Sequence, residues 1–194
     1  DPLLMLGKPK QLTISTGLDA LSHALESLWN VNANPVSLVY AVSAAREILQ
    51  VLPDLANALD DVPLRTRMAK AALFAGLAFS NTKTAIAHSL SYPITLLHKV
   101  QHGIACSFSL PLVLRSVADA DGLCREGLSA IFGEDLRAGS RKLEAMLGKL
   151  GISTDPDSYG VGPDEWKGLV ENALSGERGR NFIGSKEALI GASM

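Results

Sequence analysis

The chain has few cysteines and no strong excess of charge of either sign. Its 194 residues include only Cys106 and Cys124, too few and too irregularly spaced for a disulfide framework or a thiolate zinc site. Cys106 lies in the apolar run "IACSFSLPLVL", so we expect both thiols to be buried or inert. The formal net charge of −2 gives no electrostatic reason for a nucleic acid or an anionic membrane to bind.

Long apolar runs and targeting signals are also lacking. No apolar run approaches the roughly 20 residues that span a bilayer, and the first ten residues, "DPLLMLGKPK", lack the features of a signal peptide. We therefore expect a cytoplasmic protein with neither a membrane nor a nucleic acid as a partner. The chain begins with Asp1 rather than methionine, in a proline-containing segment, which suggests a piece of a longer protein.

Helical periodicity recurs from end to end, and alternating strand-like runs are nearly absent, so we predict an all-α fold. The expected helices cover residues 16–29, 63–81, 84–98 and 102–118. A further helix is expected over residues 35–50, with a kink or restart at Pro53 and an end near residues 60–61. From residue 119 the helices become shorter and more charged and end at glycines. We predict one helical domain, 1–194, in which residues 119–194 form an outer layer on the helices of residues 1–118. There is no internal repeat and no glycine-rich phosphate loop.

Four side chains stand out as candidate metal ligands. Asp19 and His23 lie four residues apart on an expected helix, so both project from one face and can hold one divalent cation. The simpler alternative is a side-chain hydrogen bond between them. His88 and His102 lie in apolar segments, where each could be a hydrogen-bonded core histidine. One metal bound by three imidazoles and one carboxylate would satisfy all four groups together, so we predict that site.

The segments that carry these residues resemble a known family. "STGLDALSHALES", "AFSNTKTAIAHSLSYPI" and "QHGIACSFSLPLVLR" are similar to the metal-binding segments of the iron-containing (group III) alcohol dehydrogenases, related to glycerol dehydrogenase and dehydroquinate synthase. The family's order of aspartate and three histidines matches Asp19, His23, His88 and His102, the last followed by Gly103. "ERGRNFIGS" resembles the family's C-terminal Arg-Asn-Asn-Pro segment, with Asn-Phe in place of Asn-Pro.

This resemblance implies a multi-helical, dehydroquinate synthase-like C-terminal domain that lacks the family's N-terminal α/β nucleotide-binding domain. It implies NAD(P)-dependent oxidation of an alcohol or reduction of an aldehyde, with Fe²⁺ or Zn²⁺ polarising the substrate oxygen for hydride transfer. NAD(P) would bind through the absent domain, so no residue of this chain is assigned to the cofactor. We expect the chain alone to be inactive.

Several residues and two segments bear on the substrate. Many family members have a second histidine four residues after the third ligand, and this chain has Tyr92 there, which makes Tyr92 the candidate catalytic residue. "SLWNVNANPVS" and "NTKTAIAHSLSYPIT" are similar to a subgroup associated with phosphonate metabolism, thought to interconvert phosphonoacetaldehyde and hydroxyethylphosphonate. Lys83 or Lys99 could supply a cation for such an anionic substrate, and the alternative is that both are solvated loop lysines.

Other interpretations remain open. The chain could be a non-catalytic helical binding or interaction module whose histidines complete a core. It could also be a lyase-type relative of dehydroquinate synthase, although such relatives begin their ligand set with glutamate. His98 is expected at a loop or cleft edge and not among the ligands. The expected partners are a small alcohol or aldehyde and a second copy of the chain, which would associate through a cleft surface exposed near Tyr92 and His98.

Overall fold

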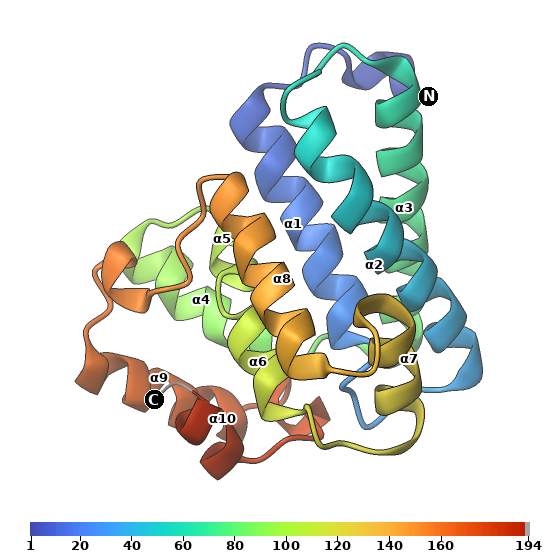
Figure 1. Ribbon diagram of the computed structural model, residues 1–194. Helices are drawn as coiled ribbons and strands as arrows, with labels where there is room; N and C mark the ends of the chain where they lie inside the picture. Colours follow the sequence, from blue (N-terminus) through green and yellow to red (C-terminus); the bar gives the residue numbers. More distant parts are fainter. Residues whose placement is uncertain (193–194) are drawn as a thin grey trace.

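The computed structural model describes residues 1–192, and its regular elements are all helices (Figure 1). No strand occurs in this range, and an isolated bridge pairs Asn30 with Phe182. The all-α prediction is therefore confirmed. The α-helices are α1 (Lys10–Glu26), α2 (Pro35–Leu55), α3 (Val62–Thr82), α4 (Ile86–His98), α5 (His102–Ser107), α6 (Leu110–Ser116), α7 (Gly122–Phe132), α8 (Leu136–Lys149), α9 (Pro163–Ser175) and α10 (Lys186–Ala192), with short 3-10 helices at Pro2–Met5, Pro156–Tyr159 and Gly179–Asn181.

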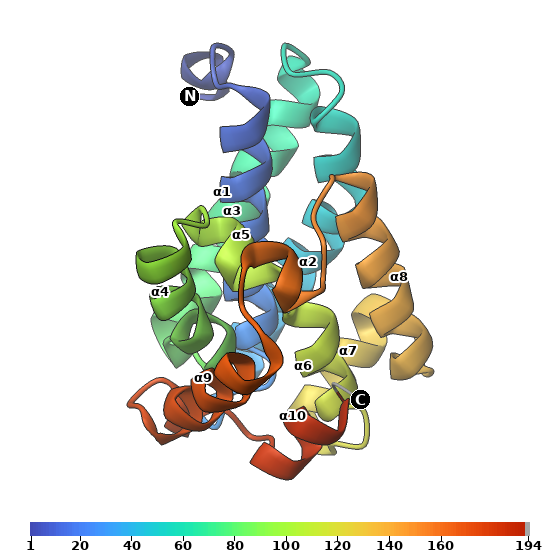
Figure 2. The same ribbon diagram turned by 90° about the vertical axis from the view of Figure 1, so that its left-hand side faces the viewer.

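Helix α1 is the centre of the molecule, because α2, α3, α4 and α5 all pack against it (Figures 1 and 2). It starts at Lys10, six residues before the predicted start, and ends at Glu26 rather than at residue 29. Glycine is a weak helix former, but Gly17 lies inside α1. A Cβ at Gly17 would lie 2.6 Å from a Leu52 methyl carbon, so this glycine serves the close packing of α1 against α2.

Helix α2 begins at a capping box formed by Asn34 and Ser37 and runs without a restart through Pro53 to Leu55. The predicted kink and the predicted end near residue 60 are therefore wrong. Pro53 lies in the last turn, where its missing N–H removes one hydrogen bond and little helix remains to be disrupted. Helix α3 covers Val62–Thr82, close to the predicted 63–81, with Pro63 in its first turn.

By length and composition alone, α2 could also span a membrane. It has 21 residues and a mean hydropathy of 1.2 over an 18-residue window, so the expectation that no apolar run approaches this length is wrong for α2. The core helix of a globular protein passes the same test. Ala44, Ile48 and Val51 of α2 are fully buried against the rest of the bundle.

The predicted helix 84–98 is α4, whereas the predicted helix 102–118 is divided into α5 and α6 at Phe108 and Ser109. Pro111 explains the division, because it lies in the first turn of α6 and cannot donate a hydrogen bond to the preceding turn. Helix α5 approaches α1 closely at Gly103, where a Cβ would lie 1.9 Å from the carbonyl oxygen of Ser15. This approach places the start of α5 directly beside α1.

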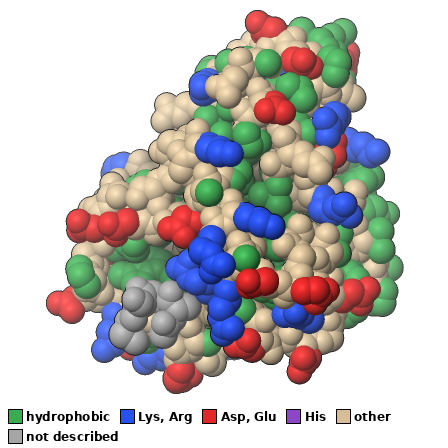
Figure 3. Space-filling view, in the orientation of Figure 1, with side chains coloured by type: hydrophobic (Ala, Val, Ile, Leu, Met, Phe, Trp, Pro, Cys, Tyr) green, Lys and Arg blue, Asp and Glu red, His purple; other side chains and the backbone are tan. Residues whose placement is uncertain are grey.

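The remaining helices pack around the first six. Helix α7 contacts α2, α8 contacts α6, and α9 and α10 lie together beside α4 and α6 (Figure 2). After α9 the chain returns to the loop that follows α1, where the Val31 N–H donates to the Asn181 carbonyl at 2.8 Å. The face shown in Figure 3 carries acidic and basic side chains of both signs, and no histidine is visible on it. The division into residues 1–118 and 119–194 stays a prediction.

Candidate metal centre

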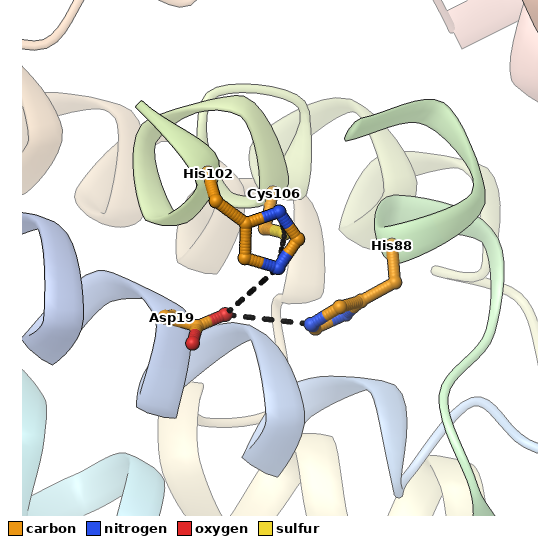
Figure 4. A group of neighbouring side chains, drawn as sticks. All are labelled: Asp19, His88, His102 and Cys106. Carbon is orange, nitrogen blue, oxygen red and sulfur yellow. Dashed lines mark hydrogen bonds and ion pairs between the residues drawn. The ribbon is translucent and has the colours of Figure 1, made fainter. Parts of the chain in front are cut away.

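One carboxylate oxygen lies close to three imidazole nitrogens. The Oδ1 atom of Asp19 is 3.4 Å from His88 Nε2, 3.7 Å from His23 Nε2 and 3.8 Å from His102 Nε2. These residues come from α1, α4 and α5, and Figure 4 shows Asp19, His88 and His102 pointing toward one another. Ligands bound at about 2.1 Å around a tetrahedral ion are about 3.4 Å apart, so this spacing fits one divalent metal.

Hydrogen bonding supports the same interpretation. Asp19 Oδ1, His88 Nε2 and His23 Nδ1 are buried and have no hydrogen-bond partner among the described residues. Buried polar atoms are normally satisfied, and leaving one unsatisfied costs about 1–3 kcal/mol. A cation between Asp19 and His88 would satisfy two of these three atoms at once. The donor set, imidazole and carboxylate, suits a divalent transition metal.

Cys106 is a second candidate for the fourth ligand, in contrast to the inert thiol expected from the sequence. One ligand atom each from Asp19, His88, His102 and Cys106 all lie within 4.8 Å of one another (Figure 4). Cys106 Sγ is 3.5 Å from His102 Nε2. His23 is not part of this grouping. The signal that could have revealed Cys106 is its spacing of four residues from His102 on α5, the same spacing that joins Asp19 and His23 on α1.

His23 is held by its neighbours in a stacked position. Its ring lies 4.1 Å from the Phe79 ring and 4.3 Å from the His88 ring, measured between centroids, and is nearly parallel to both. Burial, with the charge of His88 as the next cause, lowers the pKa of His23 to about 4. His23 is therefore neutral at physiological pH, which is the form that binds a metal.

Glu26 is a buried carboxylate that sequence reasoning missed. It is fully buried, and its Oε2 lies 2.5 Å from His88 Nδ1. Its Oε1 accepts hydrogen bonds from the backbone N–H groups of Ala87 (2.6 Å) and His88 (3.1 Å), at the start of α4. Glu26 thus holds the Nδ1 side of His88 and leaves Nε2 directed at Asp19, the arrangement by which carboxylates orient metal-binding histidines. Its position seven residues after Asp19, on the same helix face, was the available signal.

The charges of these groups are coupled. Burial would raise the pKa of Asp19, but the three neighbouring histidines outweigh it and lower that pKa. Burial would lower the pKa of His88, but the nearby Asp19, Cys106 and Glu26 side chains outweigh it and raise that pKa. The raised pKa of His88 reflects the two carboxylates beside it, which would equally attract a divalent cation in competition with a proton on His88 Nε2.

A cavity of about 520 Å³ opens beside the histidines. His23, His88 and His102 line one side of it, together with Tyr92, whose ring centroid is 5.9 Å from that of His102. His98 does not line this cavity. It is the last residue of α4, and its Nε2 lies 2.8 Å from Glu165 Oε1.

Of the two lysines considered from the sequence, the cavity includes only Lys83. The Lys99 side chain turns back to its own helix, where Nζ donates to the Leu96 carbonyl at 2.9 Å. The cavity also includes Arg178, Asn181 and Glu177 from the segment after α9, more than 70 residues beyond the last histidine. The family resemblance of "ERGRNFIGS" singled out this segment, but nothing in its spacing from the histidines placed it at the cavity.

The chain is similar in sequence to known alcohol dehydrogenases. Residues 13–187 match the sequence model described as the Fe-containing alcohol dehydrogenase family, C-terminal. The chain is 32% identical over 185 residues to 1,3-propanediol dehydrogenase of Citrobacter freundii, which covers 90% of this chain and 47% of that protein.

Solved structures have the same fold. An alcohol dehydrogenase from Oenococcus oeni matches with a TM-score of 0.88 and 26% identity, over 99% of this chain and 53% of that one. The sulfoacetaldehyde reductase from Bifidobacterium kashiwanohense, solved in complex with NAD⁺, matches with a TM-score of 0.87 and 27% identity, over 97% of this chain and 51% of that one. The chain therefore spans about half the length of the relatives that it matches.

Proposed function

Because the chain belongs to the Fe-containing alcohol dehydrogenase family, as its C-terminal domain, we propose that it is the metal-binding part of an NAD(P)-dependent alcohol dehydrogenase or aldehyde reductase. The observation that carries this proposal is the position of Asp19 Oδ1 within 3.8 Å of the Nε2 atoms of three histidines. A bundle whose histidines only complete a core has no need to direct three imidazoles at one buried carboxylate oxygen.

We propose Asp19, His23, His88 and His102 as the ligands. A divalent metal bound by them polarises the oxygen of an alcohol or a carbonyl. Imidazole and carboxylate donors suit both Fe²⁺ and Zn²⁺, and the family name favours iron. Cys106 is the alternative fourth donor, and a thiolate there would favour zinc.

The chain's own residues would prepare the site for the substrate. Glu26 fixes His88, and Tyr92 forms a wall of the cavity on the solvent side, where its side chain is 40% exposed. We propose that Tyr92 contacts the substrate in the place of the histidine that many family members have. The NAD(P) that supplies or accepts the hydride would bind outside this chain, in the other half of the longer protein that the relatives' lengths suggest.

The narrower proposal concerns the substrate. We propose that it is a short aldehyde or alcohol with an anionic end, such as phosphonoacetaldehyde or hydroxyethylphosphonate. Two lines support this choice: the similarity of two segments to the phosphonate-associated subgroup, and a structural neighbour that is named a sulfoacetaldehyde reductase. Phosphonoacetaldehyde and sulfoacetaldehyde are both two-carbon aldehydes that end in a tetrahedral oxyanion.

Metal analysis of the purified chain tests the proposed function. We expect about one transition-metal ion per chain after reconstitution with Fe²⁺ under anaerobic conditions or with Zn²⁺, and about none in an Asp19→Asn variant that keeps its helical content. NADH and NADPH should show no saturable binding to the chain in calorimetric titration. A folded chain that binds no metal would favour the non-catalytic helical module instead.

A further inference from the structure

Two cationic side chains line the metal cavity without an anionic partner. Lys83 follows α3, and Arg178 follows α9. Among the described residues no carboxylate oxygen lies within 4.0 Å of either cationic group, although Glu177 also lines the cavity. Two such charges outnumber the one carboxylate of the lining, Glu177, and neither is paired with it, so the cavity attracts an anion.

Arg178 is held in a fixed orientation with its donors free. Its guanidinium carbon lies 4.8 Å from the centroid of the Tyr92 ring, in cation–π contact. Its Nε donates to Thr84 Oγ1 at 3.2 Å. The terminal nitrogens Nη1 and Nη2 make no hydrogen bond among the described residues, so the N–H edge that binds oxyanions in a bidentate manner is available while the face of the guanidinium stacks on Tyr92.

The backbone around Arg178 is fixed by contacts from distant parts of the chain. Gly179 allows the turn after α9, because a Cβ there would lie 2.0 Å from the Ala173 carbonyl oxygen. Asn181 Nδ2 donates to the Thr84 carbonyl at 2.8 Å, and the Ile183 N–H donates to the Trp29 carbonyl at 3.3 Å. The fold therefore places Arg178 at the cavity, although the residue is also exposed to solvent.

Lys83 has an unusual backbone conformation at the cavity edge. Its φ of 64° lies in the region that favours glycine, and its carbonyl accepts a hydrogen bond from Asn30 Nδ2 at 3.2 Å. Backbone strain of this kind clusters at functional sites. Lys99 has a similar φ of 59°, but its Nζ is occupied by the Leu96 carbonyl. The Lys83 Nζ has no such partner among the described residues, so its charge is available to the cavity.

We propose that Lys83 and Arg178 form an anion subsite in the metal cavity and select substrates that end in a tetrahedral oxyanion. This inference rests on the proposed function for the reacting end of the substrate, and on the two cations for the other end. The hydroxyl of Thr84, which lines the same cavity and accepts a hydrogen bond from Arg178, keeps its own proton as an uncharged donor for an oxyanion. Two cations match a dianion better than a monoanion, so a phosphonate binds more tightly than a sulfonate, and both bind more tightly than a neutral alcohol.

The test is calorimetric titration of the zinc-reconstituted chain with 2-hydroxyethylphosphonate, 2-hydroxyethanesulfonate and 1-propanol. Lys83→Gln and Arg178→Gln should each weaken phosphonate binding by about tenfold or more, the usual effect of losing a charge-assisted contact, and should leave 1-propanol unaffected. Lys99→Gln is the matched control for Lys83, and Arg180→Gln is the matched control for Arg178. Each control should change the dissociation constant by less than about twofold.

Two outcomes would overturn the subsite: phosphonate binding no tighter than that of 1-propanol, or equal losses in all four variants. Repeating the titrations with EDTA-treated protein separates this inference from the proposed function. A chain that binds no metal, yet prefers the phosphonate and loses that preference in Arg178→Gln, would keep the subsite and reject the proposed function. A metal-binding chain that does not distinguish the three probes would keep the function and reject the subsite.

Discussion

Glu26 and His88 form a buried pair in which a carboxylate on α1 holds the Nδ1 side of an imidazole on α4 at 2.5 Å. The other oxygen of the same carboxylate caps the start of α4 through the N–H groups of residues 87 and 88. One fully buried side chain therefore fixes the helix that carries His88 and the direction of the His88 ring. We therefore expect Glu26 to contribute both to metal affinity and to the stability of the start of α4.

Replacing Glu26 separates these two roles. In Glu26→Gln, the amide oxygen can still accept from the start of α4, but the neutral side chain no longer favours a proton on His88 Nδ1. We expect metal affinity to fall by about 10–100-fold with a small change in melting temperature. Glu26→Ala should lower both, because it also leaves the α4 N–H groups uncapped. Metal titration and thermal unfolding of the metal-free proteins measure the two effects, and unchanged metal affinity in Glu26→Gln would show that orientation of His88 by the carboxylate is unimportant.

His88 and His102 should be indispensable for metal binding. His88→Ala and His102→Ala each remove a ligand of the proposed site, so we expect tight binding of Zn²⁺ to be lost in competition with a chelating indicator dye. His98→Ala is the control, because His98 pairs with Glu165 and does not line the metal cavity. It should leave the metal affinity nearly unchanged. If His98→Ala lost as much affinity as the other two variants, the ligand assignment would be wrong.

The fourth ligand is decided by comparing His23→Ala with Cys106→Ser. If His23 is the ligand, as we propose, His23→Ala weakens metal binding severely and Cys106→Ser has little effect. Co²⁺ provides a direct measurement, since a thiolate ligand gives an intense near-ultraviolet charge-transfer band that imidazole and carboxylate ligands do not give. We expect the Co²⁺ form of the unmodified chain to lack that band. Its presence, and its loss in Cys106→Ser, would assign Cys106 in the place of His23.

Several features of this site could be predicted from sequence, and others could not. Asp19 and His23 lie on one face of α1, as their spacing of four residues requires. His88 and His102 reach the same point because α4 and α5 both pack on α1, which the apolar surroundings of both histidines and the family resemblance indicated but periodicity did not. The contribution of Arg178 depends on a return of the chain after α9, and local periodicity carries no information about such a return.

The errors in the helix boundaries have a common physical cause. The local preferences of Gly17 and Pro53 indicate a helix start and a helix break. In the fold, Gly17 packs closely on the Leu52 side chain of α2, and Pro53 falls where a helix is already ending. Tertiary packing overrides the local preference at Gly17, and the sequence around it gives no sign of the neighbour, Leu52.

Gly103 offers a test of how α5 positions His102. A Cβ at Gly103 would lie 1.9 Å from the Ser15 carbonyl oxygen, so Gly103→Ala must push α5 away from α1 and move His102. We expect a loss of about 2 kcal/mol or more in unfolding free energy and a marked loss of metal affinity.

Gly76→Ala in α3 is the matched control, because a Cβ there would have no neighbour within 4 Å and alanine favours helix. It should stabilise the chain by about 0.5–1 kcal/mol and leave the metal affinity unchanged. Denaturant unfolding of both variants checks the prediction, and similar destabilisation by both would contradict it.

The exposed side of α4 should make the chain associate with itself. Leu96 and Leu97 are 67% and 68% exposed, and with Tyr92 they place three large apolar side chains on one helix beside the metal cavity. Apolar surface of this kind is usually covered, and a second copy of the chain is the partner present in a purified sample. We expect sedimentation velocity to show concentration-dependent dimers or larger species, which the double variant Leu96→Gln with Leu97→Gln shifts toward monomer. Val39→Gln on α2, a residue 67% exposed, is the control and should leave the distribution as it is. Dimers that persist in the α4 double variant and disappear in Val39→Gln would place the contact on α2, and the cavity side of α4 would then be free in the associated chain.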